Sequence, residues 1–553
     1  MKDSSLTTET HETFVENLTV ELMGIPSING TDGEVEIIHH LEDRLKKLAY
    51  FQNKPDLVWT QKFENDYLNR KNLFALVKGQ KEASQKTVIL HAHCDTVTVE
   101  DFGALEEGAY NPSKLMKSLD QLDLPDEVKE DLHSGDWLFG RGSVDMKSGI
   151  AAHFWVLKYL SERVEEFAGN VLFMINPIEE TTHGGVIEAV PELERIQEEL
   201  HLHFVNAINT DFTGPLYQGD KSNYFYLGSV GKLLPAFLIR GKETHVGQPF
   251  EGLDPNHIAS ELFRNIQLNP NLSDYHAGEL TPPPTALKMR DLKPTYNVQT
   301  PIESFLYFNY FVHGNSPDKV MDQLRSIAEA SFEKVVYEAN NAYRKYCKKN
   351  NMAYTPLPWK PNVTTFSELY AQELRRQGPE LTERLQEILE TYAGKEDPRE
   401  VTRRMVQEVL NSSSSKDPVV VIFFCTPYVP RNYVKGKNDN EKKLLGILND
   451  ITSQDGNIKI LNFFPFLSDS SYLALDDTKE EIEQLIANFP GMEKLYPVPV
   501  DKIRKLDIPA ITMGVYGKDA HKFTERVYKP YSFEKLPILI RDVVVKVLGN
   551  EST

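Results

Sequence analysis

Two adjacent carboxylates, Glu179 and Glu180, end an apolar run that begins at Val171. A strand that delivers neighbouring acidic residues to its carboxyl end points their side chains in different directions. One carboxylate can then bind a metal ion while the other takes a proton from water. A solvated loop would also explain the pair, but the apolar strand before it favours a site. The pair suits a metal-dependent hydrolase.

Three further acidic residues and one histidine lie where predicted strands end or a predicted helix begins. His93 and Asp95 follow the apolar run 87–90 and share one face of a strand, so the carboxylate could fix the tautomer of a metal-binding imidazole. Asp145 precedes a predicted helix, and Asp211 closes another apolar run. Each has an ordinary explanation, as a hydrogen-bonded pair, a helix N-cap or a turn residue. In isolation these explanations are favoured.

Two more histidines follow later in the chain, His521 after a predicted strand and His245 in a polar segment. Either could be a surface residue. What favours a site is the shared position of the candidates, because ligands of open α/β sheets bind at the carboxyl ends of strands. This edge would bring together His93, Asp145, Glu180, Asp211 and His521. Two imidazoles and three carboxylates suit two divalent ions with one bridging carboxylate.

The elements that must position these residues follow from hydrophobic periodicity. Apolar runs predict strands that alternate with amphipathic helices in the first part of the chain. The predicted strands are 73–78, 87–91, 170–176 and 204–209, and the predicted helices are 10–23, 33–48, 151–163 and 185–200. Such alternation is typical of an α/β layer with a largely parallel sheet.

The pattern changes near Gly219. Predicted strands at 224–228, 232–239 and 304–312 and predicted helices at 254–266 and 317–346 indicate a smaller α+β domain. We therefore expect a catalytic domain formed by residues 1–220 and 436–553. A lid domain over 221–435, with a helical insertion at about 347–417, would interrupt it.

Composition narrows the class of protein. The chain has 553 residues and a formal net charge of −20, which argues against nucleic acid or an anionic membrane as the main partner. Its three cysteines are far apart, so a disulfide framework is not expected. The sequence lacks an apolar signal core at its start and any long apolar run. These features predict a cytoplasmic location.

The order of the motifs resembles the co-catalytic zinc aminoacylase, acetylornithine deacetylase and glutamate carboxypeptidase family, peptidase family M20. The motifs are HxD at His93, GRGxxDMKxG at 140–149, Glu179-Glu180, the acid Asp211, GxxxHxGxP at 241–249 and AHxxxE at 520–525. By length and insertion the chain looks most like the arginine-utilisation branch. The resemblance implies a phosphorylase/hydrolase-like α/β catalytic domain, interrupted by an α+β lid of the dimerisation type.

The resemblance also implies how the ligands are shared. His93 and Asp211 would hold one metal ion, Glu180 and His521 the other, and Asp145 would bridge the two. Zinc is the default for this ligand set, and manganese or cobalt also suits carboxylate-rich sites.

Three residues would act on the reaction. Asp95 would orient His93, and Glu179 would be the general base for the metal-activated water. His245 in the lid domain would stabilise the oxyanion, in relatives often across the interface of a homodimer formed through the lid.

The chain departs from the family pattern at several positions. Ser148 stands where relatives often have glycine, and Pro177-Ile178 replaces the common Pro-Asp. The segment 308–313 lacks the arginine that usually ends a lid strand and binds a substrate carboxylate. The loop 468–471 resembles the family's Gly-Gly-Thr-Asp loop without its glycines.

These observations favour a hydrolase that cleaves an amide bond in a small peptide or N-acyl amino acid, with a role in arginine or amino-acid degradation. The alternative is a non-catalytic metal- or ligand-binding protein on the same scaffold, which would have no reason to keep the base Glu179. A third hypothesis is hydrolysis of a phosphoester on two metal ions, but the sequence shows no cluster of arginine or lysine that would bind the phosphate.

Overall fold

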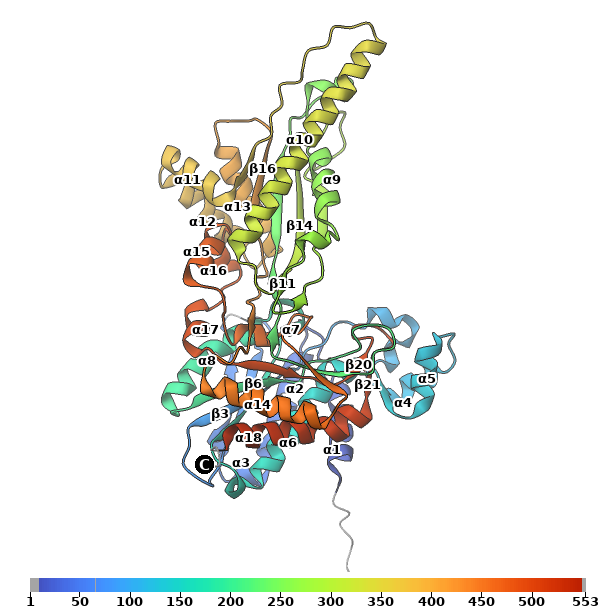
Figure 1. The fold of residues 1–553 in the computed structure, drawn as a ribbon, viewed down its shortest axis with the longest axis vertical. Coiled ribbons are helices and arrows are strands. Elements are labelled where there is room, and N and C mark those ends of the chain that lie inside the picture. The colour runs from blue at the N-terminus through green and yellow to red at the C-terminus, as the bar shows by residue number, and fades with distance from the viewer. Residues whose placement is uncertain (1–8, 65, 550–553) are drawn as a thin grey trace, which may run out of the picture. The chain divides into compact units, whose positions relative to one another are not determined.

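The computed structural model describes residues 9–64 and 66–549 and divides into two compact units. The first unit comprises the chain up to Ser229, Asn432–Leu475 and the chain from Pro499 onward. The second unit comprises Val230–Arg431 and Asp476–Val498. The domain limits at 220 and 435 remain predictions, and the compact units differ from them most at 476–498. In Figure 1 the blue part of the chain and its dark-red C-terminal end belong to the first unit, whereas α15 (Lys479–Ala487) and α16 (Met492–Leu495) belong to the second.

An eight-stranded sheet forms the centre of the first unit, in the order β1-β2-β5-β3-β6-β19-β7-β18. The strands are β1 (Val58–Lys62), β2 (Lys71–Lys78), β3 (Lys86–His93), β5 (Asn170–Asn176), β6 (His203–Asn209), β7 (Asn223–Tyr226), β18 (Ile458–Leu461) and β19 (Ala510–Met513). β3 runs parallel to both β5 and β6, and β19 runs parallel to β6. β2 is antiparallel to β5. The α/β sheet is therefore parallel through its centre, as the sequence predicts.

The central strands are buried on both faces, which explains why they read as continuous apolar runs. In their register His93 of β3 lies opposite Asn176 of β5, and His91 lies opposite Asn209 of β6. The carboxyl ends of these three strands therefore reach the same edge of the sheet. This register places the residues that follow each strand beside one another.

Helices cover both faces of this sheet. Leu73, Ala75 and Val77 share an apolar cluster with five helices. These are α1 (His11–Met23), α2 (Gly33–Lys46), α6 (Ser148–Ser161), α14 (Asp439–Gln454) and α18 (Leu536–Leu548). On the opposite face Phe74 stacks on Trp59, whose indole Nε1 donates a hydrogen bond to Glu192 of α8 (Gly184–Glu199).

Strand β7 differs from expectation. Residues 224–228 read as the beginning of the second domain, yet β7 lies in the first sheet, parallel to β18 and antiparallel to β19. Both partner strands come more than two hundred residues later in the chain. Local periodicity identifies a strand but carries no information about a partner so distant in sequence.

The second unit is built on a mostly antiparallel sheet, in the order β13-β14-β10-β16-β15. The strands are β10 (Pro235–Arg240), β13 (Thr285–Asp291), β14 (Glu303–Val312), β15 (Val363–Thr365) and β16 (Val419–Phe424). Ala236 and Leu238 of β10 face one apolar cluster, to which α11 (Phe366–Gln377), α12 (Glu380–Tyr392) and α13 (Pro398–Ser412) contribute. The sequence insertion therefore supplies a helical layer over one face of this sheet. Figure 1 shows α9 (Pro255–Ile266) and α10 (Pro317–Lys349) beside the same strands.

Glu261 joins α9 to α10 and gives this unit an acid-sensitive contact. Its carboxylate accepts hydrogen bonds from Arg264, Asn265 and, at 2.8 Å, from Lys334 Nζ. The hydrogen bond from Arg264 lowers the pKa of Glu261 from 4.5 to about 2, against the opposing effect of burial. A lowered folded-state pKa gives stability that is complete above the unfolded value and is lost as pH falls from 4.5 to about 2.

We therefore expect Glu261→Gln to lower the unfolding midpoint at pH 7 and to make no difference near pH 2. Denaturant unfolding of both proteins across this pH range measures the effect. An equal difference at both pH values would show that the contact is not a source of acid sensitivity.

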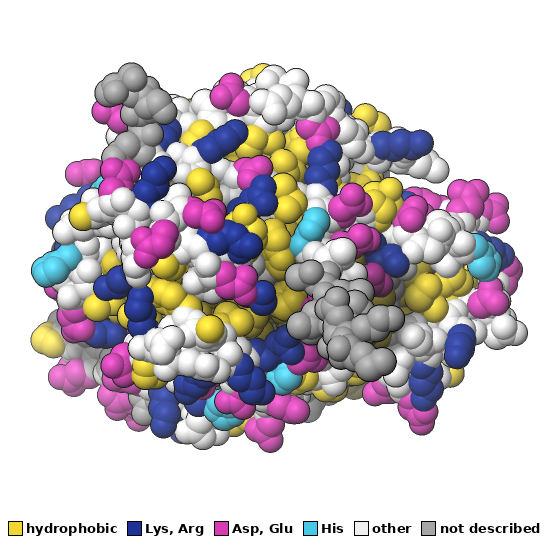
Figure 2. Space-filling view, turned by 90° about the horizontal axis from the view of Figure 1, so that it is seen from below, with side chains coloured by type: hydrophobic (Ala, Val, Ile, Leu, Met, Phe, Trp, Pro, Cys, Tyr) yellow, Lys and Arg dark blue, Asp and Glu magenta, His cyan; other side chains and the backbone are white. Residues whose placement is uncertain are grey.

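Charges of both signs are mixed on one face of the protein. On the face drawn in Figure 2, lysine and arginine side chains are interspersed with acidic ones rather than gathered by sign. Among the described residues, none of the helices combines the length and the apolar character that crossing a lipid bilayer requires.

Candidate metal centre

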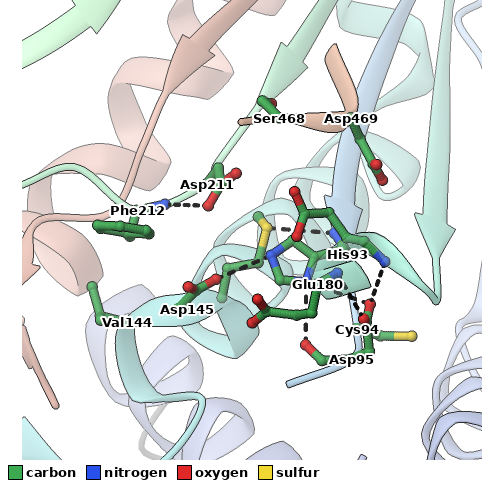
Figure 3. Close-up of polar contacts among 12 residues, drawn as sticks. His93, Cys94, Asp95, Val144, Asp145, Glu180, Asp211, Phe212, Ser468 and Asp469 are labelled. Atoms are coloured by element: carbon green, nitrogen blue, oxygen red, sulfur yellow. Dashed lines mark hydrogen bonds and ion pairs between the residues drawn. The ribbon is translucent and has the colours of Figure 1, made fainter. Parts of the chain in front are cut away.

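The first group of candidate ligands joins three elements of the first unit. His93 ends β3, Asp211 follows β6, and Asp145 lies in the turn Ser143–Lys147 before α6. Their ligand atoms lie within 4.8 Å of one another, and all three side chains are buried. Figure 3 shows the three side chains meeting from separate segments of the chain.

The second group contains Asp145, Glu180 and His521, again within 4.8 Å of one another. Asp145 belongs to both groups, and its two oxygens point to different imidazoles. Its Oδ1 lies 3.1 Å from His93 Nε2, and its Oδ2 lies 3.0 Å from His521 Nε2. Glu180 Oε2 lies 3.1 Å from the same His521 nitrogen. The five predicted ligands are therefore gathered in one place, with one carboxylate between two groups.

The donor set fits divalent cations. Imidazole nitrogens and carboxylate oxygens are the ligands that zinc, manganese and cobalt accept. Within the described part of the chain, Glu180 Oε1 is buried and receives no hydrogen bond. A buried carboxylate oxygen without a donor is costly, and a cation beside it would remove that cost.

The site concentrates negative charge around two imidazoles. Burial lowers the pKa of His93, but the charge of Glu179 and a hydrogen bond with Asp145 raise it well above its usual range. The hydrogen bond with Asp145 raises the pKa of His521 to about 11. Burial raises the pKa of Asp211 to about 8, and the charge of Asp145 adds to the rise. Both imidazoles thus hold their protons against a cluster of carboxylates, and divalent cations would displace those protons.

Asp95 acts on the glutamate pair as well as on His93. Its Oδ1 lies 3.7 Å from His93 Nδ1, which is closer, at 3.2 Å, to the backbone carbonyl oxygen of Asp95. The carboxylate accepts hydrogen bonds from the backbone N–H groups of Glu179 and Glu180, both at 3.0 Å. Asp95 therefore fixes the turn that carries both glutamates, a contact that the HxD spacing alone does not indicate.

That turn has an unusual backbone. Glu179 and Glu180 open the short helix α7 (Glu179–Thr182), and Ile178 before them has a positive φ of 68°. Such a conformation costs on the order of 1 kcal/mol for a β-branched residue and persists where surrounding contacts impose it. Glu34 supplies one such contact by accepting a hydrogen bond from Ile178 N. The backbone of Gly185 packs closely against the same turn: a Cβ at this position would lie 2.1 Å from the Pro177 carbonyl oxygen, so the close packing requires glycine.

The loop that carries Asp145 is held by a buried ion pair. Arg141 Nη1 lies 2.5 Å from Glu525 Oε2, and both side chains are almost fully buried. Glu525 Oε1 accepts hydrogen bonds from the backbone N–H groups of Val144 and Asp145. The glutamate of the AHxxxE motif, for which the sequence analysis gives no role, thus links the His521 segment to the loop of Asp145.

Arg141→Met is expected to destabilise the protein by about 3–5 kcal/mol, because it leaves Glu525 buried without its partner. Denaturant unfolding measures the loss. Arg163→Met is the matched control, since Arg163 is partly exposed and pairs with Glu162 at the surface, where about 0–1 kcal/mol is expected. Equal losses in the two variants would contradict a special role for the buried pair.

His245 belongs to the second unit. Its side chain is exposed, its backbone forms a bridge with Gln299, and its Nδ1 accepts a hydrogen bond from Gly247 N. Its assignment to the oxyanion remains a prediction.

Two residues beside the site are not among the candidate ligands or catalytic residues that the sequence indicates. His183 Nδ1 lies 2.9 Å from Asp469 Oδ1, and both lie next to Glu179. They are 286 positions apart in the chain. Asp469 stands in the loop that resembles a family motif, but His183 matches none of the motifs.

Comparisons with known proteins identify the family of this chain. A sequence model of the peptidase family M20/M25/M40 matches residues 89–441. Protein RocB of Bacillus subtilis is 41% identical over 545 residues, covering 97% of this chain and 95% of RocB. The uncharacterized protein YqjN of the same organism is 34% identical over 541 residues, covering 97% and 96% of the two chains.

A solved structure shares the fold. The crystal structure of a tripeptidase from Staphylococcus aureus aligns with a TM-score of 0.52 at 14% identity, covering 97% of this chain and 98% of the tripeptidase. The family match spans well over half of the chain, and the similarity to RocB spans nearly all of it. This chain therefore belongs to the peptidase family M20/M25/M40, a family of hydrolases, and is similar to RocB over almost its full length.

Proposed function

We propose that this protein is a dinuclear metallohydrolase that cleaves an amide bond with water, using Glu179 as the general base. The observation that carries the proposal is the position of Asp145, which is shared between two groups of candidate ligands. Glu179 stands beside Glu180 in sequence but belongs to neither of these two groups; the acidic and imidazole side chains grouped with it are those of His183 and Asp469. A ligand and a base can therefore come from adjacent residues.

His93 and Asp211 would hold one ion, Glu180 and His521 the other, and Asp145 would contact both. When bound, two divalent cations supply a water molecule whose pKa falls from about 15.7 towards about 7, and they polarise the scissile carbonyl. Asp95 would keep both glutamates in place through their backbone N–H groups.

Glu179 would move the proton. Burial raises the pKa of its carboxyl well above the usual range, and the carboxylate of Asp469 adds to this effect while His93 opposes it. A base with a raised pKa is better matched to taking a proton near neutral pH. Glu179 would take the proton from the attacking water and pass it to the leaving amine nitrogen as the C–N bond breaks, which restores the carboxylate.

The substrate we propose is a small peptide or an N-acyl amino acid, in arginine or amino-acid degradation. The peptidase family match and the similarity to RocB support this class. His245 would stabilise the oxyanion, in a homodimer formed through the second unit. The cytoplasmic location remains a prediction.

Removal of metal tests the proposal directly. Dialysis against a chelator should abolish hydrolysis of N-acyl amino acids and dipeptides, and added zinc, manganese or cobalt should restore it. Amine release from a panel of both substrate classes, with each metal, measures the activity and identifies the substrate. Metal binding without hydrolysis of any member of the panel would favour the non-catalytic alternative.

A further inference from the structure

A buried pair, His183 and Asp469, lies directly behind the proposed base. His183 Nδ1 is 2.9 Å from Asp469 Oδ1 and 3.5 Å from Glu179 Oε1. The His183 and Asp469 side chains are 4% and 2% exposed, so water does not replace these contacts. One imidazole N–H thus faces two carboxylates, one of which is the base.

The second oxygen of Asp469 points to another histidine. Asp469 Oδ2 lies 3.6 Å from Nε2 of His91, which is fully buried. Four buried side chains thus follow one another in contact: Glu179, His183, Asp469 and, farthest from the base, His91. The Asp469 carboxylate therefore forms a hydrogen bond with one imidazole and faces a second imidazole at a longer distance.

The segment that carries Asp469 also reaches a candidate metal ligand. Asn209 Nδ2 donates a hydrogen bond to Ser468 Oγ at 3.0 Å, and Asn209 Oδ1 accepts one from Asp211 N at 2.8 Å. Figure 3 shows Ser468 and Asp469 on the side of the site next to Asp211 and His93. Residues 468–469 thus contact His183, which lies beside the proposed base, and Asn209, which binds the backbone of the candidate ligand Asp211.

The position of His183 is imposed by its surroundings. It stands between α7 and α8 with a positive φ of 54°, which few non-glycine residues adopt. Its ring packs on Tyr472, with 5.3 Å between the ring centroids. Strained backbone of this kind persists where several contacts fix it, and it gathers at functional sites.

We propose that Asp469 and His183 are positioning residues for Glu179: Asp469 accepts the hydrogen bond of the His183 Nδ1–H and so fixes the imidazole 3.5 Å from Glu179 Oε1. The inference rests on the proposed function, because it takes Glu179 as the base. An imidazole fixed beside one oxygen of Glu179 restricts the rotation of this carboxylate, and its other oxygen would take the proton from the water. The pair would therefore affect turnover rather than substrate binding or metal binding.

The test uses Asp469→Asn and His183→Gln in the full-length, metal-loaded protein, assayed on the best substrate of the panel. Supporting groups of this kind typically contribute about 10–100-fold to activity. We expect kcat to fall by about this factor in both variants, with KM little changed and with wild-type metal content by elemental analysis. Loss confined to kcat is the mark of an interaction that acts in the transition state.

Asp220→Asn is the matched control. Asp220 is also buried, and its carboxylate accepts hydrogen bonds from Leu216, Ser222 and Tyr224 rather than from the site. It should lower the unfolding midpoint without lowering kcat. A fall in kcat that follows stability in all three variants would overturn the proposal, since it would reveal a merely structural role.

A second readout does not depend on turnover. Crystal structures of the metal-loaded wild type and of Asp469→Asn should show the Glu179 side chain displaced or spread over two rotamers in the variant. An unmoved Glu179 together with wild-type kcat would overturn the positioning role. If Glu179→Gln itself kept full activity, the proposed function would fail instead, and the two failures are thus distinguishable.

Discussion

Glu179→Gln is expected to lower kcat by about 10²–10⁴-fold while the metal content stays at the wild-type level. Glutamine keeps the size and the acceptor oxygen of the side chain but cannot take a proton. The backbone N–H of residue 179 would still donate to Asp95, so the turn that carries Glu180 should keep its shape. The loss would therefore report proton transfer alone.

Steady-state kinetics on the identified substrate and elemental analysis of the same sample measure this effect. Glu188→Gln on α8 is the matched control, because Glu188 is half-buried and outside both groups of candidate ligands. Its kcat should match the wild type. Full activity of Glu179→Gln would remove the base assignment, and loss of metal would make Glu179 a ligand instead.

The strands that build the site are the part of the fold that the sequence predicts best. Predicted strands 87–91 and 170–176 correspond to β3 (Lys86–His93) and β5 (Asn170–Asn176). Their apolar runs are long because both faces are buried, so periodicity and length suffice. The rule that sites form at the carboxyl ends of such strands then selects His93 and Glu180 from many possible acids and histidines.

Contacts between distant segments could not be predicted in this way. The pairing of β7 with β18, the hydrogen bond between His183 and Asp469 and the ion pair between Arg141 and Glu525 each join residues more than two hundred positions apart. The spacing of apolar residues within a segment carries no information about a partner so far away in the sequence. Asp95 illustrates a second limit, because spacing predicts its nearness to His93 but not its hydrogen bonds to the glutamate backbone.

The candidate metal centre of the first unit depends on the chain segment that follows the second unit, from Pro499 onward. His521, with a positive φ of 66°, comes from this segment, as does Glu525, which holds the Asp145 loop. One candidate group would lose its imidazole without this segment. A fragment that ends before it would keep β3, β5 and β6 but not the second group.

Asp145→Asn is expected to remove both metal ions, whereas His521→Ala should remove one. Asp145 offers one oxygen to each group, and the asparagine amide has a single acceptor oxygen and an NH₂ that repels a cation. His521 contacts only the group of Asp145 and Glu180, so His93 and Asp211 remain for the other ion.

Elemental analysis after gel filtration should therefore give a metal content near zero for Asp145→Asn and near half of the wild type for His521→Ala. Activity should fall by more than about 100-fold in both variants, beyond the effect of a supporting residue. Asp211→Asn provides a further comparison, because it should remove one ion while leaving His521 in place. If Asp145→Asn lost no more metal than His521→Ala, Asp145 would serve one ion only, and the two groups would be separate sites rather than one dinuclear centre. The metal content of these three variants thus decides between a bridging and a terminal carboxylate without any knowledge of the substrate.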